Sequence, residues 1–564
     1  MSERIRDLVF KIYSDVNDAE KIHQGLTGLV SEYKKKIDQN ERGVSFSNKD
    51  AFLITYGDSI LGVQGEHLRT LDTFLSNELG ENISIVHILP FYPYSSDDGF
   101  SVIDYNEVNS DFGNWDDIRG IAEKKKIMFD YVVNHISQKS PWFQNYLAGK
   151  DGFLNLAHEV DQNIDRSMVV RPRTLPLVHE YEKEDGSKVH LWTTFSKDQV
   201  DVNFADPDTV IRMIDVFLSY VEKGASVIRL DAIAYLWKKD GTNCIHLDET
   251  HDMVRLMRAL LDEVAPKVRI ITETNVPHED NISYFGDDGK EADMVYNFSL
   301  PPLMLHMFLA CDSTYFNRWV EEKLKTTHDG KLFYNFTSSH DGVGLNGARG
   351  IISEIEIMKL VEVVEQNGGR VNFKSNADGS KVPYEMNTSW VDAFKKDGNE
   401  VEKAIASYAI KLSLPGVPAF YINSILGDEN WIEGMERSGH NRTINRRKFQ
   451  YNEIAGILKD KNSREAKISN SISRLLSIRR SQEVFDPAGG FRVLDMGQKI
   501  FAIVREKADD KLVAITNISN KVQCLDFRNE FGGKVVDLVS SDILNPEGVD
   551  ISPFQTLWLK STRE

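Results

Sequence analysis

Cysteine is nearly absent from this sequence: Cys244, Cys311 and Cys524 are spread over 564 residues. Their odd number and wide spacing exclude a disulfide framework and a cysteine-based metal site. The sequence also lacks an apolar stretch suited to a bilayer, and the first residues lack the apolar segment of a secretory signal. We therefore expect a cytoplasmic protein.

Basic residues are in deficit, because 67 Lys and Arg against 86 Asp and Glu give a net charge of −19. Such acidity argues against binding to nucleic acid or to an anionic membrane surface. It also means that an anionic substrate would need a local cluster of basic side chains. With 41% hydrophobic residues the chain can form a large core and one or two smaller domains, whereas its oligomeric state cannot be read from the sequence.

Short apolar segments that alternate with helical patterns dominate the middle of the chain. We predict strands at 52–56, 85–89, 127–133, 227–230, 270–272, 294–298, 332–337 and 417–422. Eight β segments with helices between them favour a (β/α)₈ TIM barrel, an α/β fold, over an open sheet.

The spacing of these strands also predicts regions outside the barrel. The first residues show only helical periodicity, two long gaps between strands must hold inserted subdomains, and the last residues have short strands typical of an antiparallel β domain. The expected bounds are 1–47 for the N-terminal helical extension, 48–134, 205–341 and 405–484 for the barrel, 135–204 and 342–404 for the insertions after strands three and seven, and 485–564 for the C-terminal β domain.

Polar residues stand where several predicted barrel strands end. Asp231 closes the fourth strand, Glu273 follows the fifth, and His340-Asp341 follows the seventh. Because the carboxyl ends of barrel strands meet at one rim, these groups should share a site. Two carboxyl groups there suit glycosyl transfer, one as the nucleophile and the other as the general acid/base.

The two acids need opposite protonation states for this chemistry. Arg229 lies two residues before Asp231 on the same strand face, so its guanidinium should lower the pKa of that carboxyl group. Glu273 must instead carry a proton at neutral pH, which an apolar pocket would favour. Taken singly, an Arg-x-Asp pair or a strand-end Glu is more often structural. The gathering of acidic, histidine and arginine side chains on one rim is what favours catalysis. Phe100 or Tyr235 could supply an apolar platform for a sugar ring.

The ordered set Asn134-His135, Arg229-Leu-Asp231-Ala, Glu273 and His340-Asp341 resembles the four signature regions of the α-amylase superfamily. The resemblance implies that Asp231 is the nucleophile, that Glu273 is the acid/base and that Asp341 holds the 2- and 3-hydroxyls of the sugar. It further implies that His135, Arg229 and His340 complete the glucose subsite. Neither a metal nor a cofactor is expected.

Further motifs resemble the sucrose phosphorylase branch of that superfamily and cover about residues 50 to 450. They include Asp97-Asp-Gly-Phe100, Arg171-Pro-Arg-Thr-Leu-Pro176, Leu414-Pro-Gly-Val-Pro418 and Arg442-Thr-Ile-Asn-Arg446. The resemblance implies that Asp97 and Arg442 close a pocket for one glucosyl unit. It also implies that Arg173 contacts phosphate, with Tyr384 as a helper.

Within the branch the sequence is most similar to the glucosylglycerate phosphorylases, notably in its N-terminal extension, in Glu273-Thr-Asn-Val-Pro-His278 and in Pro383-Tyr-Glu-Met-Asn387. Sucrose phosphorylases have histidine where Asn275 stands and glutamine where Glu385 stands, which argues against fructose as the leaving group. Phosphate and glycerate are both anions, so the acceptor site should be cationic. We assign Arg173, Lys238, Asn275, Tyr384 and Glu385 to it.

The expected activity is the reversible phosphorolysis of 2-O-α-D-glucosyl-D-glycerate to α-D-glucose 1-phosphate and D-glycerate by double displacement. The partners would be a sugar substrate, phosphate as co-substrate and a small acceptor. Sucrose, sucrose 6′-phosphate and glucosylglycerol phosphorylases are alternatives, as is an α-glucosidase or transglucosidase. A catalytically inactive amylase-like module is disfavoured, because Asp231, Glu273 and Asp341 are all present.

Overall fold

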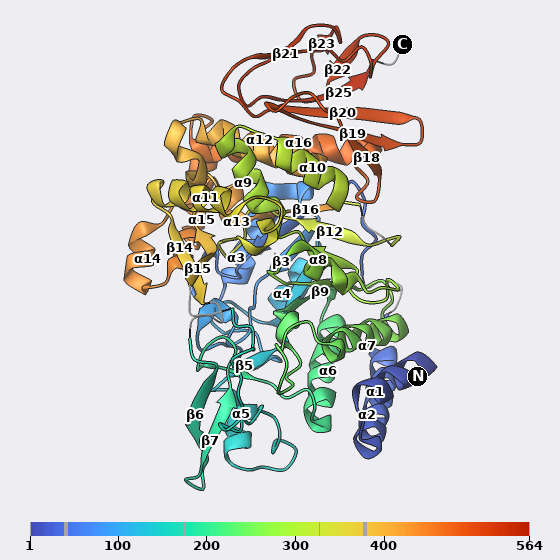
Figure 1. Cartoon of the computed structure of the whole chain (residues 1–564), viewed down its shortest axis with the longest axis vertical. Helices are drawn as coiled ribbons and strands as arrows, with labels where there is room; N and C mark the ends of the chain where they lie inside the picture. Colours follow the sequence, from blue (N-terminus) through green and yellow to red (C-terminus); the bar gives the residue numbers. More distant parts are fainter. Residues whose placement is uncertain (1, 39–42, 173–174, 326–327, 376–380, 563–564) are drawn as a thin grey trace.

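A closed barrel of eight parallel strands forms the centre of the protein (Figure 1). The structure is a computed structural model that describes residues 2–38, 43–172, 175–325, 328–375 and 381–562. The barrel strands, in spatial order, are β1 (Phe52–Thr55), β3 (Ile85–Ile88), β4 (Lys126–Val132), β9 (Ala225–Asp231), β10 (Arg269–Thr272), β11 (Met294–Tyr296), β12 (Leu332–Asn335) and β16 (Val417–Tyr421). Each predicted strand overlaps one of them, and the predicted barrel is confirmed.

The barrel strands are buried along almost their whole length, and only Lys126 and Arg269, each at the start of its strand, depart from this pattern. Helices cover the outer face of the barrel and side chains fill its interior, so both faces of each strand are buried, which explains the continuous apolar segments. The covering helices are α3 (His67–Phe74), α4 (Trp115–Ala122), α6 (Pro207–Glu222), α7 (Asp248–Val264), α8 (His278–Ile282), α9 (Leu300–Ala310), α10 (Thr314–Lys323), α12 (Glu400–Ser413), α13 (Ile422–Ile425), α14 (Ile432–Ser438), α15 (Tyr451–Lys459) and α16 (Arg464–Ser481).

The N-terminal segment forms two helices, α1 (Glu3–Ile12) and α2 (Val16–Lys36), that pack against α7 and α6 (Figure 1). Asp15 caps α2 by accepting from the amides of Asn17 and Asp18. Lys11 of α1 pairs with Asp252 of α7 at 2.8 Å. Helix α6 precedes β9 in the chain and α7 follows it, so the extension packs on the two helices next to the strand that ends in Asp231.

Two insertions rise from the barrel near the carboxyl ends of its strands. The first, between β4 and β9, contains α5 (Pro141–Leu147), the pair β5 (His135–Ser137) and β8 (Gln199–Asp201), and the hairpin of β6 (Val178–Glu182) and β7 (Lys188–Trp192). The second follows β12 and contains β13 (Val343–Gly344), α11 (Glu354–Gln366), β14 (Arg370–Ser375) and β15 (Lys381–Asn387). Strands β13, β15 and β14 form one small sheet, in that order.

The C-terminal part is an antiparallel β domain at the opposite end of the molecule from the first insertion (Figure 1). Its strands are β18 (Gly490–Val493), β19 (Ile500–Lys507), β20 (Asp510–Asn517), β21 (Gln523–Leu525), β22 (Val535–Asp537), β23 (Ile543–Leu544), β24 (Val549–Ile551) and β25 (Thr556–Ser561). The apolar segments 500–504, 512–517, 535–539 and 556–559 predict β19, β20, β22 and β25 from the sequence. The other four have only two to four residues each, too short for an alternating apolar pattern to stand out.

No helix in the described ranges combines the length and apolar character required to cross a membrane.

Candidate active site

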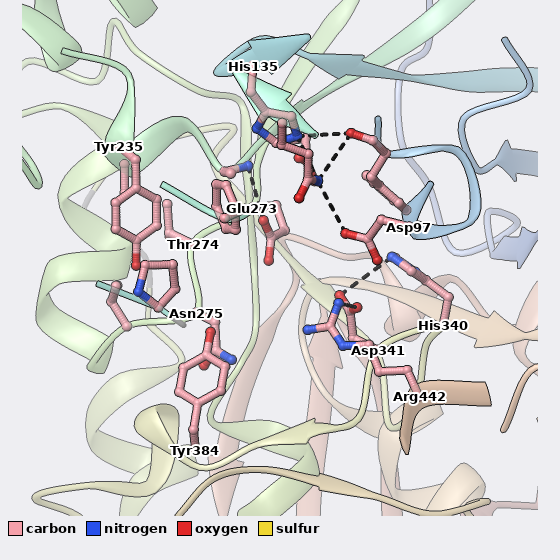
Figure 2. Close-up of a pocket in the computed structure, with 18 residues that line it drawn as sticks. Asp97, His135, Tyr235, Glu273, Thr274, Asn275, His340, Asp341, Tyr384 and Arg442 are labelled. Atoms are coloured by element: carbon pink, nitrogen blue, oxygen red, sulfur yellow. Dashed lines mark hydrogen bonds and ion pairs between the residues drawn. The ribbon is translucent and has the colours of Figure 1, made fainter. Parts of the chain in front are cut away.

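A small pocket, with a cavity volume of about 70 Å³, opens at the carboxyl ends of the barrel strands (Figure 2). It collects most of the predicted site residues from the barrel loops and from both insertions. Those that line it are Asp97, Phe100, His135, Asp231, Tyr235, Glu273, Asn275, His340, Asp341, Tyr384 and Arg442.

Asp231 is the last residue of β9, and the buried side chain of Arg229 holds its carboxylate. Arg229 donates from Nη1 to Oδ1 of Asp231 at 2.6 Å, and it also hydrogen-bonds to Asp130 and to the hydroxyl of Tyr296. Its side chain is fully buried under Asp231 and does not line the pocket. The two residues share a strand face, as their spacing predicts. Arg229 therefore orients Asp231.

Glu273 is fixed by the turn that follows Asp231. The amide of Ala232 donates to Oε2 of Glu273 at 3.2 Å. Ala232 has a φ of 50°, a left-handed conformation that costs a residue with a Cβ about 1–2 kcal/mol. Strain of this kind persists where the surrounding structure enforces it, often at functional sites. Here it points a main-chain donor at the second carboxyl group.

The two carboxyl groups raise the question of where a proton resides. Burial raises the pKa of Asp231 to about 8, Arg229 opposes this effect, and the charge of Glu273 adds to it. Burial also raises the pKa of Glu273, with a further contribution from Asp341. Arg229 thus lowers the pKa of Asp231 as predicted, but desolvation outweighs the guanidinium and the net shift is upward.

Two carboxyl groups this close share one proton near neutral pH. The position of Arg229 determines whether Asp231 or Glu273 carries it. Its Nη1 lies 2.6 Å from Oδ1 of Asp231, whereas its Nη2 lies 3.7 Å from Oε2 of Glu273. The closer guanidinium contact favours the negative charge on Asp231 and the proton on Glu273.

Arg442 links the third acid to the second insertion. Its Nη1 lies 2.5 Å from Oδ1 of Asp341, and its Nε and Nη2 donate to the two oxygens of Glu385 at 3.0 and 2.6 Å. Glu385 is buried and does not line the pocket. Alternate residues of a strand point to opposite faces, so Tyr384 faces the pocket and Glu385 does not. The assignment of Glu385 to the acceptor site is therefore corrected: Glu385 positions Arg442.

The loop after β3 supplies the apolar wall on one side of the pocket. The ring of Phe100 stacks on that of His340 with centroids 5.0 Å apart, and Nε2 of His135 donates to the carbonyl oxygen of Phe100 at 2.9 Å. Burial lowers the pKa of both histidines, so each is a neutral hydrogen-bonding group at neutral pH. Gln199 donates to Oδ2 of Asp97 at 3.2 Å.

Asp198 of the first insertion anchors this same loop. Its Oδ2 accepts from Ser95 at 2.5 Å, from Ser101 at 2.8 Å and from Ser96. Asp97, inside the anchored segment, has a φ of 53°. Neither Asp198 nor Gln199 was identified from the sequence, since their roles depend on how the insertion folds onto the barrel and no motif marks them.

Lys238 does not reach the pocket. Its Nζ lies 2.6 Å from Oδ2 of Asp201 and donates to Oδ1 of Asn134 at 2.7 Å and to the carbonyl of Tyr235 at 2.7 Å. The side chain is almost fully buried, so its charge is already satisfied by protein groups. The assignment of Lys238 to the acceptor site is corrected: it is a structural ion-pair partner. The predicted Arg173 lies outside the described residues.

Over the described part of the chain, no group of three or more His, Cys, Asp or Glu side chains is arranged to hold a metal ion.

Comparisons with known proteins agree with this geometry. Residues 77–343 match the family model of the α-amylase catalytic domain. The chain is 42% identical to the glucosylglycerate phosphorylase of Escherichia coli K12, over 99% of this chain and 100% of that protein. It is 29% identical to the sucrose phosphorylase of Streptococcus mutans, over 83% of this chain and 95% of that one. The crystal structure of sucrose 6F-phosphate phosphorylase from Thermoanaerobacter thermosaccharolyticum superposes with a TM-score of 0.73 at 24% identity, over 84% and 94% of the two chains, and shows the shared fold.

Proposed function

Because this chain belongs to the α-amylase family, in the group of the glucosylglycerate phosphorylases, we propose that it transfers an α-glucosyl unit between D-glycerate and phosphate with retention of configuration. The observation that carries the proposal is the arrangement of Asp231 and Glu273 around Arg229, in a pocket that Asp341 also lines. The substrate would be 2-O-α-D-glucosyl-D-glycerate, and the product α-D-glucose 1-phosphate.

In the first step Asp231 attacks the anomeric carbon and the bond to the glycerate oxygen breaks. Glu273 gives its proton to that oxygen, so D-glycerate leaves as an alcohol and a β-glucosyl-Asp231 ester remains. In the second step a phosphate oxygen attacks the same carbon from the face that glycerate left. Asp231 departs as a carboxylate, and Glu273 takes a proton from the phosphate. Two inversions give net retention.

The walls of the pocket divide it into two ends. Asp97, His340 and Arg442 lie together on the right in Figure 2, and Tyr235, Asn275 and Tyr384 lie on the left, with Glu273 between them. We assign the right-hand end to glucose, where Asp341 would hold hydroxyls and Phe100 would pack on the ring. The left-hand end would take glycerate and phosphate in turn. Phosphate is a co-substrate, and this chemistry requires no cofactor.

Replacement of Glu385 by glutamine should weaken glucose binding. The change keeps the size of the side chain but removes the charged fork that holds Arg442. A hydrogen bond to a charged group contributes about 1.5–3 kcal/mol, so we expect KM for α-D-glucose 1-phosphate to rise about tenfold with little change in kcat. Steady-state kinetics measure this. Glu362→Gln, on the exposed face of α11, is the control, and an unchanged KM in Glu385→Gln would reject the positioning role.

The proposed acceptor is tested in the synthetic direction. With α-D-glucose 1-phosphate as donor, phosphate release is followed in the presence of D-glycerate, fructose, fructose 6-phosphate or glycerol. D-Glycerate should give the largest kcat/KM. Faster release with any of the other three would reject glycerate as the acceptor, and hydrolysis as the main outcome would favour a glucosidase.

A further inference from the structure

A half-buried lysine stands next to the acceptor end of the pocket and has no role in the steps above. Lys374 lies on β14 of the second insertion. Its Nζ donates to Oδ1 of Asn346 at 3.2 Å and lies 6.0 Å from the ring centre of Tyr384, which lines the pocket. Asn346 in turn donates to the main-chain oxygen of Asn275, another lining residue, at 2.9 Å. The ammonium group is thus one side chain away from two residues of the acceptor wall.

The charge of Lys374 is not balanced within the described part of the protein, where no carboxylate forms an ion pair with it. Glu354 is the carboxylate that acts on the charge of Lys374, but it already forms an ion pair with Arg349 at 2.5 Å. Burial and the neighbouring Arg349 lower the pKa of Lys374. Keeping a cation partly desolvated without a counter-charge costs free energy, which a bound anion would recover.

Lys238 shows the contrast within the same protein. Its ammonium group is enclosed by the Asp201 carboxylate and three oxygen acceptors and has no donor left for a ligand. An ammonium group has three N–H donors, and among the described residues Lys374 has one acceptor, Asn346. Its flexible four-carbon stem lets the charge shift toward Tyr384. Of the two lysines, Lys374 is the one whose ammonium group keeps N–H donors that no acceptor among the described residues takes.

We propose that Lys374 selects the acceptor: its ammonium group binds the carboxylate of a small hydroxy acid while the hydroxyl of that acid faces Glu273. The inference rests on the proposed function and deepens it, because it names the group that distinguishes glycerate from a neutral polyol of similar size. Lys374 acts by recognising charge and takes no part in bond making or breaking.

The test compares acceptors that differ in charge. With α-D-glucose 1-phosphate as donor, Lys374→Met should lower kcat/KM for D-glycerate about 30-fold, mainly through KM, because a hydrogen bond between charged groups is lost. Transfer to glycerol, which carries no charge, should stay within about threefold of the unmodified protein. Lys374→Arg should restore most of the activity with glycerate. Lys359→Met, an exposed lysine on α11, is the matched control, and thermal unfolding checks that each variant is folded.

The outcomes separate this inference from the proposed function. If the unmodified protein does not use D-glycerate, the proposed function fails. If it does, and Lys374→Met lowers transfer to glycerate and glycerol alike, or lowers neither, the selective role of Lys374 is rejected while the proposed function stands.

Discussion

Replacement of Asp231 by alanine should lower kcat by a factor of about 10⁴ or more, in both reaction directions. Without this carboxylate no glucosyl ester can form, and the remaining groups of the pocket only bind the substrate. The protein should still fold, because Arg229 keeps its hydrogen bonds to Asp130 and Tyr296. Steady-state kinetics with α-D-glucose 1-phosphate measure the loss, and thermal unfolding measures the stability.

Asp231→Asn is the control for side-chain size, because it replaces one carboxylate oxygen by an amide nitrogen and so removes the charge but keeps the shape. It should be as inactive as Asp231→Ala. Activity within tenfold of the unmodified protein in either variant would mean that another residue is the nucleophile. Mass spectrometry of the quenched reaction adds a direct check, because only a protein with Asp231 should carry a covalently bound glucosyl unit.

Replacement of Glu273 by glutamine should affect the two half-reactions unequally. Transfer to the hydroxyl of D-glycerate requires a base, because an alcohol is not ionised at neutral pH, and we expect this rate to fall about 10³-fold. Phosphate is already ionised near neutral pH and is a good leaving group, so it needs less help. Exchange of labelled phosphate into α-D-glucose 1-phosphate should therefore fall by no more than about tenfold.

The unequal response distinguishes an acid/base from a residue that only shapes the pocket. A structural role would depress both rates to the same extent, and this outcome would remove Glu273 from the proposed chemistry. Thr274, the next residue and also a lining residue, offers a comparison: Thr274→Ser should leave the ratio of the two rates unchanged.

Much of the fold could be predicted from the sequence because the barrel strands are apolar segments, and several of them are followed by polar residues. The same rule located Asp231, Glu273 and Asp341, since the carboxyl ends of parallel strands converge whatever the details of the loops. Four strands of the C-terminal domain, β18, β21, β23 and β24, escaped prediction, because two to four residues contain too little pattern to separate a strand from a loop.

The acceptor side shows where sequence reasoning ends. Lys238 follows a catalytic strand and was assigned to the pocket, but burial with Asp201 removes it. Lys374 lies in an insertion and belongs to none of the motifs, and it reaches the acceptor wall only through the pairing of β14 with β15. Glu385 was identified as part of the site, yet strand alternation turns it away from the ligand and onto Arg442. Which face a side chain takes depends on tertiary pairing that a single sequence does not contain.

The most direct test of the central proposal is the reaction of the unmodified protein with 2-O-α-D-glucosyl-D-glycerate and phosphate, followed by NMR. We predict that D-glycerate and glucose 1-phosphate appear in equal amounts, that the anomeric proton of the new phosphate ester has the α configuration, and that no turnover occurs beyond slow hydrolysis when phosphate is omitted. Formation of the β anomer would contradict a double displacement through Asp231, and free glucose as the main product in the presence of phosphate would contradict a phosphorylase.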